Sequence, residues 1–123
     1  MTVLLKSIAY FNLKNVGILS KDATLKNSIL KEFPSLNFTV APYDMIYIDE
    51  LMFNNGKSYT INEHDIHNDT IILIKGIHRD QNNRDLWKDL KKMGQITVSL
   101  DMFYCGVLFF RKEQTKQHFR IRV

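Results

Sequence analysis

The sequence has little cysteine, which forms disulfide bonds, and little glycine, which forms ligand-binding loops. Its one cysteine, Cys105, cannot form an internal disulfide. Because this thiol lies within an apolar run, we interpret it as buried and unreactive. The five glycines are widely scattered and form neither a GxGxxG pattern nor a P-loop pattern. The sequence therefore excludes a disulfide scaffold and offers no candidate phosphate-binding loop.

Long hydrophobic runs are also missing. No segment approaches the roughly 18 consecutive apolar residues of a membrane span, so we expect no membrane partner. Lys6 interrupts the apolar start of the chain and no small-residue cleavage pattern follows, so we expect a strand over residues 3–11 rather than a signal peptide. One cysteine is compatible with a reducing compartment, and we expect a cytoplasmic protein.

The stretch from Ile96 to Phe110 is the apolar centre of the chain, with nine large apolar side chains. Its first part alternates apolar and polar residues up to Leu100, as a half-buried strand does. Its second part, from Tyr104, is a continuous apolar run that is interrupted from the first by Asp101. We predict two strands here, or one strand bent near residues 101–103, at the centre of a sheet.

A strand–helix–strand pattern occurs twice, over residues 3–41 and 70–100. The apolar spacing predicts one helix from Asp22 to Phe33, ended by Pro34, and a second before Gly94. We expect strands over residues 3–11, 36–40, 44–49, 58–61, 70–74 and 118–123.

These elements predict a single α/β domain over residues 1–123. Its sheet is mixed and mostly parallel, with two strand–helix–strand units and a C-terminal antiparallel edge strand. The last segment, residues 118–123, alternates apolar and basic residues and is expected to fold back beside residues 104–110.

The positive charge of the protein is concentrated at its C-terminal end. Residues 111–123 hold five basic residues and one acidic residue, which accounts for the net charge of +4 of the whole chain. If residues 118–123 form a strand, alternation places the side chains of His118, Arg120 and Arg122 on one face. Such a face can bind an acidic protein surface or nucleic-acid phosphates, or it can simply protect a sheet edge from unwanted pairing. The candidate binding residues are Arg111, Lys112, Lys116, His118, Arg120 and Arg122.

Weaker candidate site residues follow two predicted strands, the first of which covers residues 70–74. His78, Arg79 and Asp80 follow the strand over residues 70–74, at the end where open α/β sheets place ligands. An enzyme centred there would need His78 within hydrogen-bond reach of a second titratable group in a pocket.

Asp49 and Glu50 follow the strand over residues 44–49. An aspartate at the end of a third strand resembles the phosphoacceptor of response-regulator receiver domains, a resemblance that covers roughly residues 4–76 and would imply Mg²⁺-dependent phosphotransfer. That family also has an acidic pair after its first strand, where this chain has Phe11-Asn12-Leu13. We therefore do not expect phosphotransfer.

The loop from Glu63 to Asp69 holds two histidines, His64 and His67, among three carboxylates. Such side chains can bind metals, but their spacing matches no metal motif, and the loop precedes the strand that His78 follows. The two groups should thus lie at opposite edges of the sheet. We predict no metal and no cofactor, and interpret this segment as a solvated loop in which Asn68 or Asp69 satisfies turn amides.

Three functional hypotheses follow. The first is a non-enzymatic protein-interaction module of the immunity, adaptor or assembly-subunit type, which uses the basic C-terminal edge and the loops over residues 49–53 and 64–69. The second is a nucleic-acid-binding domain that uses the same edge, and the third is a small enzyme around His78. We favour the first because catalytic motifs are missing. The edge strand could also pair two copies across a two-fold axis as a homodimer.

Overall fold

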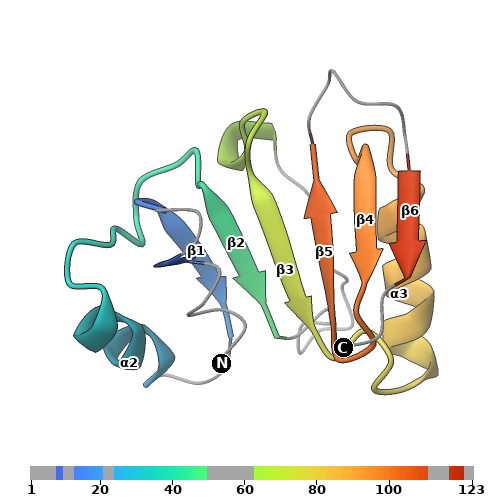
Figure 1. The fold of residues 1–123 in the computed structure, drawn as a ribbon, viewed down its shortest axis with the longest axis horizontal. Coiled ribbons are helices and arrows are strands. Elements are labelled where there is room, and N and C mark those ends of the chain that lie inside the picture. Colours follow the sequence, from blue (N-terminus) through green and yellow to red (C-terminus); the bar gives the residue numbers. More distant parts are fainter. Residues whose placement is uncertain (1–7, 10–12, 21–23, 50–62, 111–116, 121–123) are drawn as a thin grey trace.

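Six strands form one mixed sheet in the computed structural model, which describes residues 8–9, 13–20, 24–49, 63–110 and 117–120 (Figure 1). The strands are β1 (Val16–Leu19), β2 (Met45–Ile48), β3 (Ile71–Lys75), β4 (Val98–Asp101), β5 (Cys105–Phe109) and β6 (Gln117–Arg120). The helices are α2 (Leu25–Glu32) and α3 (Gln81–Lys91), with a 3-10 turn, η1, over Glu63–Asp65. The order across the sheet is β1-β2-β3-β5-β4-β6.

Most of the described strands run in one direction. Strands β1, β2 and β3 pair in parallel, and β4 pairs with β6 in parallel. Strand β5 lies between β3 and β4 and is antiparallel to both. The predicted α/β class with a mixed, mostly parallel sheet is confirmed.

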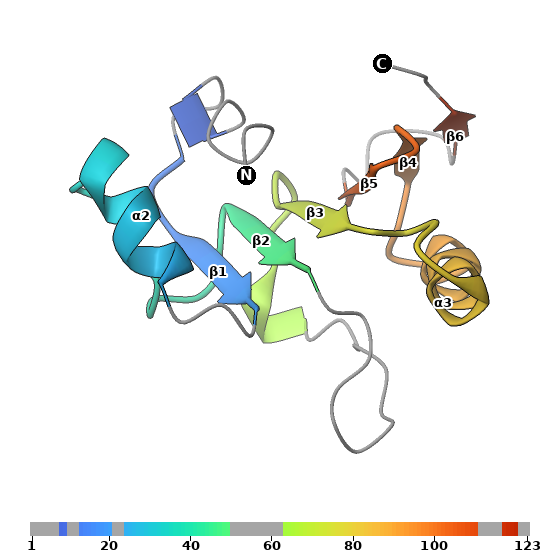
Figure 2. The ribbon, with the colours of Figure 1, turned by 90° about the horizontal axis from the view of Figure 1, so that it is seen from below.

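The two helices cover opposite faces of the sheet (Figure 2). Leu25 and Ile29 of α2 pack in a cluster with Met45 and Tyr47 of β2. Trp87 and Leu90 of α3 pack on the other face in a cluster with β2, β3 and β5 side chains. Strand β2 is buried at every position because its two faces are both covered, as its unbroken apolar sequence requires.

The predicted centre of the sheet is confirmed. Residues 96–110 form two strands, β4 and β5, joined by a turn, and β5 has neighbours on both sides. The glycine inside this apolar run has a packing reason. A Cβ atom at Gly106 would lie 2.5 Å from Cη2 of Trp87, so only glycine lets α3 approach the sheet this closely.

The prediction for the first part of the chain was wrong where the structure describes it. Ile8 and Ala9 are helical, and the first strand, β1, lies between the strand expected over residues 3–11 and the helix expected from Asp22. Residues 36–40 contain one isolated bridge, from Asn37 to Asn15, instead of a strand. The Asn37 side chain accepts hydrogen bonds from the Thr39 amide and hydroxyl, and this local turn competes with strand pairing.

Two further expectations, the first part of the strand over residues 3–11 and the strand over residues 58–61, fall outside the described residues at positions 3–7 and 58–61.

The C-terminal strand is at the edge of the sheet, as predicted, but the pairing predicted for it was wrong. Strand β6 runs opposite to β5 and yet pairs with β4, in parallel. The reason is that β3 and β4 already occupy the two sides of β5. The free side of β4 is the nearer of the two sheet edges that remain for the last strand.

Within the part of the chain that the structure describes, no helix combines the length and the apolar character that a bilayer span requires.

Candidate functional site

Polar side chains gather at the carboxyl edge of the sheet, where β1, β2, β3, β4 and β6 all end (Figure 1). Asp49 follows β2, His78 and Arg79 follow β3, Asp101 ends β4, and Arg120 ends β6. Open α/β sheets place ligands at this edge.

A buried carboxylate organises the right-hand half of this edge. The side chain of Asp101 is 6% exposed, and its Oδ2 lies 2.7 Å from Nε2 of His78. Its Oδ1 accepts a hydrogen bond from the backbone N–H of Phe103 at 2.9 Å. Both carboxylate oxygens are thus bonded, as a buried charge requires.

Asp101 was missing from the predicted site. It appeared in the sequence as a break between two apolar runs. The available signal was its position, because a carboxylate between two buried strands must find a partner.

The basic edge lies directly beside Asp101. His118 and Arg120 of β6 are in register with Ser99 and Asp101 of β4. His118 Nδ1 lies 2.6 Å from the hydroxyl of Ser99, which is buried. Nε of Arg120 lies 3.8 Å from Oδ2 of Asp101, while the Arg120 side chain is 77% exposed. The other predicted members of the basic edge, Arg111, Lys112, Lys116 and Arg122, lie outside the described residues.

Arg79 and Asp80 have local structural roles. The Oδ1 atom of Asp80 accepts from the Asn83 amide at 2.8 Å, which makes Asp80 the N-cap of α3. The Arg79 guanidinium folds over Gly76, 2.8 Å from where a Cβ atom would stand. Gly76 has a φ of 76°, a conformation that glycine adopts without strain.

Asp49 lies at the other half of the same edge. Its Oδ2 accepts from the Ser20 hydroxyl at 2.5 Å, and its Oδ1 is buried without a hydrogen-bond partner among the described residues. Glu50 lies outside them.

The potential nucleophiles near this edge are held protonated. Burial, the charge of Asp49 and the nearby Cys105 raise the pKa of Tyr47 to about 12, against an opposing effect of Arg79. Burial also raises the pKa of the Cys105 thiol. Cys105 is buried, as predicted. Because only the thiolate is nucleophilic, the buried Cys105 is a poor nucleophile at neutral pH.

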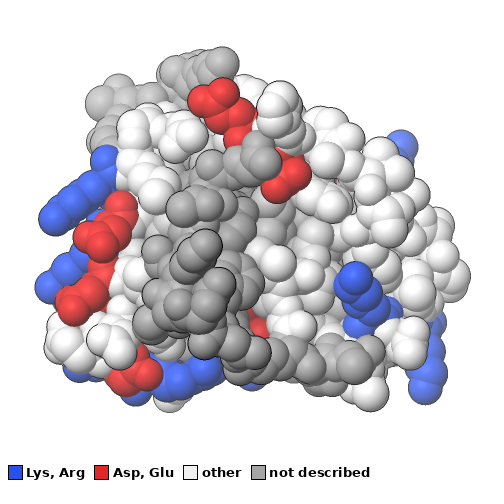
Figure 3. Space-filling model, turned by 180° about the vertical axis from the view of Figure 1, so that it is seen from behind, with Lys and Arg blue, Asp and Glu red and all other residues white. Residues whose placement is uncertain are grey.

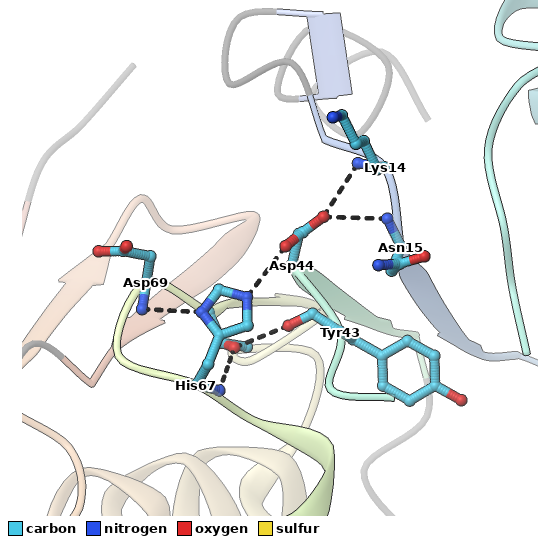
Figure 4. A network of polar contacts seen from close by, with 7 residues as sticks. Lys14, Asn15, Tyr43, Asp44, His67 and Asp69 are labelled. Carbon is cyan, nitrogen blue, oxygen red and sulfur yellow. Dashed lines mark hydrogen bonds and ion pairs between the residues drawn. The ribbon is translucent and has the colours of Figure 1, made fainter. Parts of the chain in front are cut away.

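The opposite, amino edge of the sheet carries a second polar network (Figure 4). Oδ2 of Asp44 accepts from the backbone amides of Lys14 and Asn15, each at 3.0 Å, and its Oδ1 lies 2.9 Å from Nε2 of His67. The Asp69 amide donates to Nδ1 of His67 at 3.1 Å, so a neutral His67 ring carries its proton on Nε2 and donates it to Asp44.

These bonds govern the ionisation of Asp44. Burial acts to raise its pKa, but the hydrogen bonds from Asn15, His67 and Lys14 outweigh burial and hold the pKa below its usual value. The network therefore favours the carboxylate and ties the start of β2 to the residues before β1 and β3.

The histidine loop is thus more ordered than a solvated loop. The Thr70 hydroxyl accepts from the His67 amide and donates to the Tyr43 carbonyl, both at 2.7 Å. Thr70 thus satisfies a turn amide at the end of this loop; the expectation that Asn68 or Asp69 does so stays a prediction. In the described ranges, no three His, Cys, Asp or Glu side chains are close enough to hold a metal ion.

A pocket of about 660 Å³ opens beside this loop, between Glu63 and His67 on one side and Gly94 and Gln95 on the other. It lies at the amino edge, away from His78. The conditions for an enzyme around His78 are therefore met in part: His78 has a titratable partner in Asp101, but this pocket is not at that pair.

Comparisons of the chain with protein-family models, with curated proteins and with solved structures find no match.

Proposed function

We propose that this protein is a non-enzymatic interaction module whose C-terminal sheet edge binds an acidic segment of another protein. The observation that carries the proposal is the placement of His118 and Arg120 on β6, the last strand of the sheet, both exposed and both beside a buried polar residue of β4.

The charge of Arg120 is available to a partner. His78 occupies Oδ2 of Asp101 at 2.7 Å, whereas Arg120 approaches the same oxygen only to 3.8 Å. A pair this long with one side chain 77% exposed contributes little to stability. Arg120 can therefore turn to a second carboxylate at small cost.

The backbone of β6 supports the same use. It pairs with β4 on one side, and no described strand pairs with its other side. An extended segment can add to such an edge through main-chain hydrogen bonds, while its alternate side chains meet those of the edge strand. Acidic side chains at alternate positions would meet His118 and Arg120.

The surface near α3 carries charges of both signs. On the face that α3 covers, basic and acidic side chains lie side by side along the margin of the molecule (Figure 3). This mixture favours the C-terminal edge over the α3 surface as the place where an acidic partner is selected.

The test is affinity capture from the native cell lysate, at low and high salt and with and without nuclease. The baits are the wild type, Arg120→Glu and the matched control Lys26→Glu, which reverses an exposed charge on α2. We expect the wild type to capture acidic proteins in amounts that nuclease treatment does not change. The captured amount should be the same with Lys26→Glu and should fall about tenfold with Arg120→Glu and at high salt. Equal capture by Arg120→Glu, or recovery of nucleic acid that nuclease removes, would contradict the proposal.

We further propose that the protein acts in the cytoplasm, with which its single buried thiol is compatible. The same edge could instead join two copies of the chain. Light scattering at high concentration separates the two uses, because a monomer leaves the edge open to another protein.

A further inference from the structure

Two aromatic side chains are exposed at the turn between β4 and β5. Phe103 is 51% exposed and Tyr104 is 73% exposed, and their rings meet edge to face with centroids 5.1 Å apart. Among the described residues, Val40 is the other large hydrophobic residue with comparable exposure, and it is isolated from this pair in the sequence. Adjacent exposed aromatic side chains are typical of binding surfaces, whereas ordinary solvated surface carries such residues singly.

The turn holds this pair in a defined conformation. Phe103 has a φ of 70°, which is strained for a residue with a large side chain. The Phe103 amide donates to Asp101, and the ring of Phe103 stacks on His78 with centroids 5.4 Å apart. The contact of Asp101 with His78 therefore holds both the backbone and the ring of Phe103. Strain that is maintained by surrounding contacts is typical of functional positions.

The aromatic turn is continuous with the basic edge. One carboxylate, that of Asp101, receives the Phe103 amide at Oδ1 and faces Arg120 at Oδ2. Asp101 is the last residue of β4 before the turn, and Arg120 is its partner in register on β6. The cationic side chain and the aromatic pair thus flank the same buried group.

We infer that Phe103 and Tyr104 are the apolar anchor of the partner-binding surface, and that the occupant is an extended peptide segment whose acidic side chains adjoin an apolar one. This inference rests on the proposed function. The charge of Arg120 selects the acidic part of the segment, and the aromatic pair buries the apolar part. His78 and Asp101 are positioning residues for this anchor. Binding surfaces that combine aromatic and arginine side chains concentrate their affinity in such anchors.

The test uses labelled synthetic peptides and fluorescence anisotropy. Each peptide alternates glutamate with threonine. Two versions carry a phenylalanine–leucine pair, at the N-terminus or at the C-terminus, and the control version carries a serine pair. The proteins are the wild type, the double variant Phe103→Ser/Tyr104→Ser, the single variant Tyr104→Ser and the matched control Val40→Ser. Thermal melts establish that each variant is folded, and Tyr104→Ser leaves the strained residue in place.

We expect one apolar-ended peptide to bind the wild type about tenfold more tightly than the serine version. This preference should disappear in the double variant, shrink in Tyr104→Ser and remain in Val40→Ser. Equal binding of all peptides to the wild type would overturn the anchor while leaving the basic-edge function in place. No binding of any peptide up to about 1 mM would overturn the acidic-segment function itself.

A single-stranded oligothymidylate is included as a further probe, because exposed aromatic side chains also stack on bases. If it binds more tightly than the peptides and loses affinity in Tyr104→Ser, the occupant is a nucleic acid and the inference is overturned.

Discussion

Nε2 of His78 lies 2.7 Å from Oδ2 of Asp101, and this contact joins the loop after β3 to the end of β4, 23 residues further along the chain. The side chain of Asp101 is 6% exposed and that of His78 is 24% exposed. The pair links the two strands that flank β5, and the turn with Phe103 and Tyr104 depends on it.

The first prediction concerns the energy of this pair. We expect His78→Ala to lower the free energy of unfolding by about 2 kcal/mol and Asp101→Ala by about 3 kcal/mol, because each leaves a desolvated partner. The double variant should cost less than the sum of the two, with a coupling of about 1–2 kcal/mol. Urea unfolding of the four proteins measures it. Strict additivity would mean that the contact is not formed in solution.

The second prediction concerns acid stability. The pKa of Asp44 is lowered in the folded protein, so its carboxylate stabilises the fold above the unfolded value of 3.8, and this contribution is lost as pH falls through the folded pKa. We expect Asp44→Asn to be less stable than the wild type by about 1–2 kcal/mol at pH 7. The difference should shrink below about pH 4 as the wild-type carboxylate becomes protonated.

Glu32→Gln is the control for Asp44→Asn, since Glu32 is an exposed acidic residue at the end of α2, away from the Asp44 network. Its stability should follow the wild type at both pH values. A difference between Asp44→Asn and the wild type that stays constant down to pH 2 would contradict the role given to the Asp44 network.

The third prediction concerns the contact of α3 with the sheet. Gly106→Ala places a methyl group 2.5 Å from the ring of Trp87, a residue that is 2% exposed. We expect a loss of about 1–3 kcal/mol from overpacking. Gly94→Ala is the control, because no atom lies within 4 Å of the added methyl group. Equal stability of the two variants in urea would show that α3 does not rest on β5 as described.

Much of the fold was predictable because its signals are local. The apolar run ending at Phe110 and the spacing that places Trp87 and Leu90 on one helix face can be recognised within a few residues. The first part of the chain was not predictable in this way. Strand β1 is only four residues long, which gives a weak periodic signal. The alternation over residues 36–40 predicted a strand, but the hydrogen bonds of the Asn37 side chain form a local turn there instead.

The candidate site was predictable only in part. His78 and Arg120 were recognised as candidates from their positions after a buried strand and in a basic segment. Asp101, which lies between them, was not recognised, because its role depends on two residues that are distant in the sequence.

The sequence by itself determined the α/β class, the central pair of strands and the concentration of charge at the C-terminal end, since each follows from composition or from short-range periodicity. Only the tertiary structure decided that β6 pairs with β4 and that Asp101 meets His78. The physical reason is that a strand takes whichever edge remains free once its competitors have paired, and a buried charge takes whichever partner that pairing brings near. Both outcomes depend on the whole sheet.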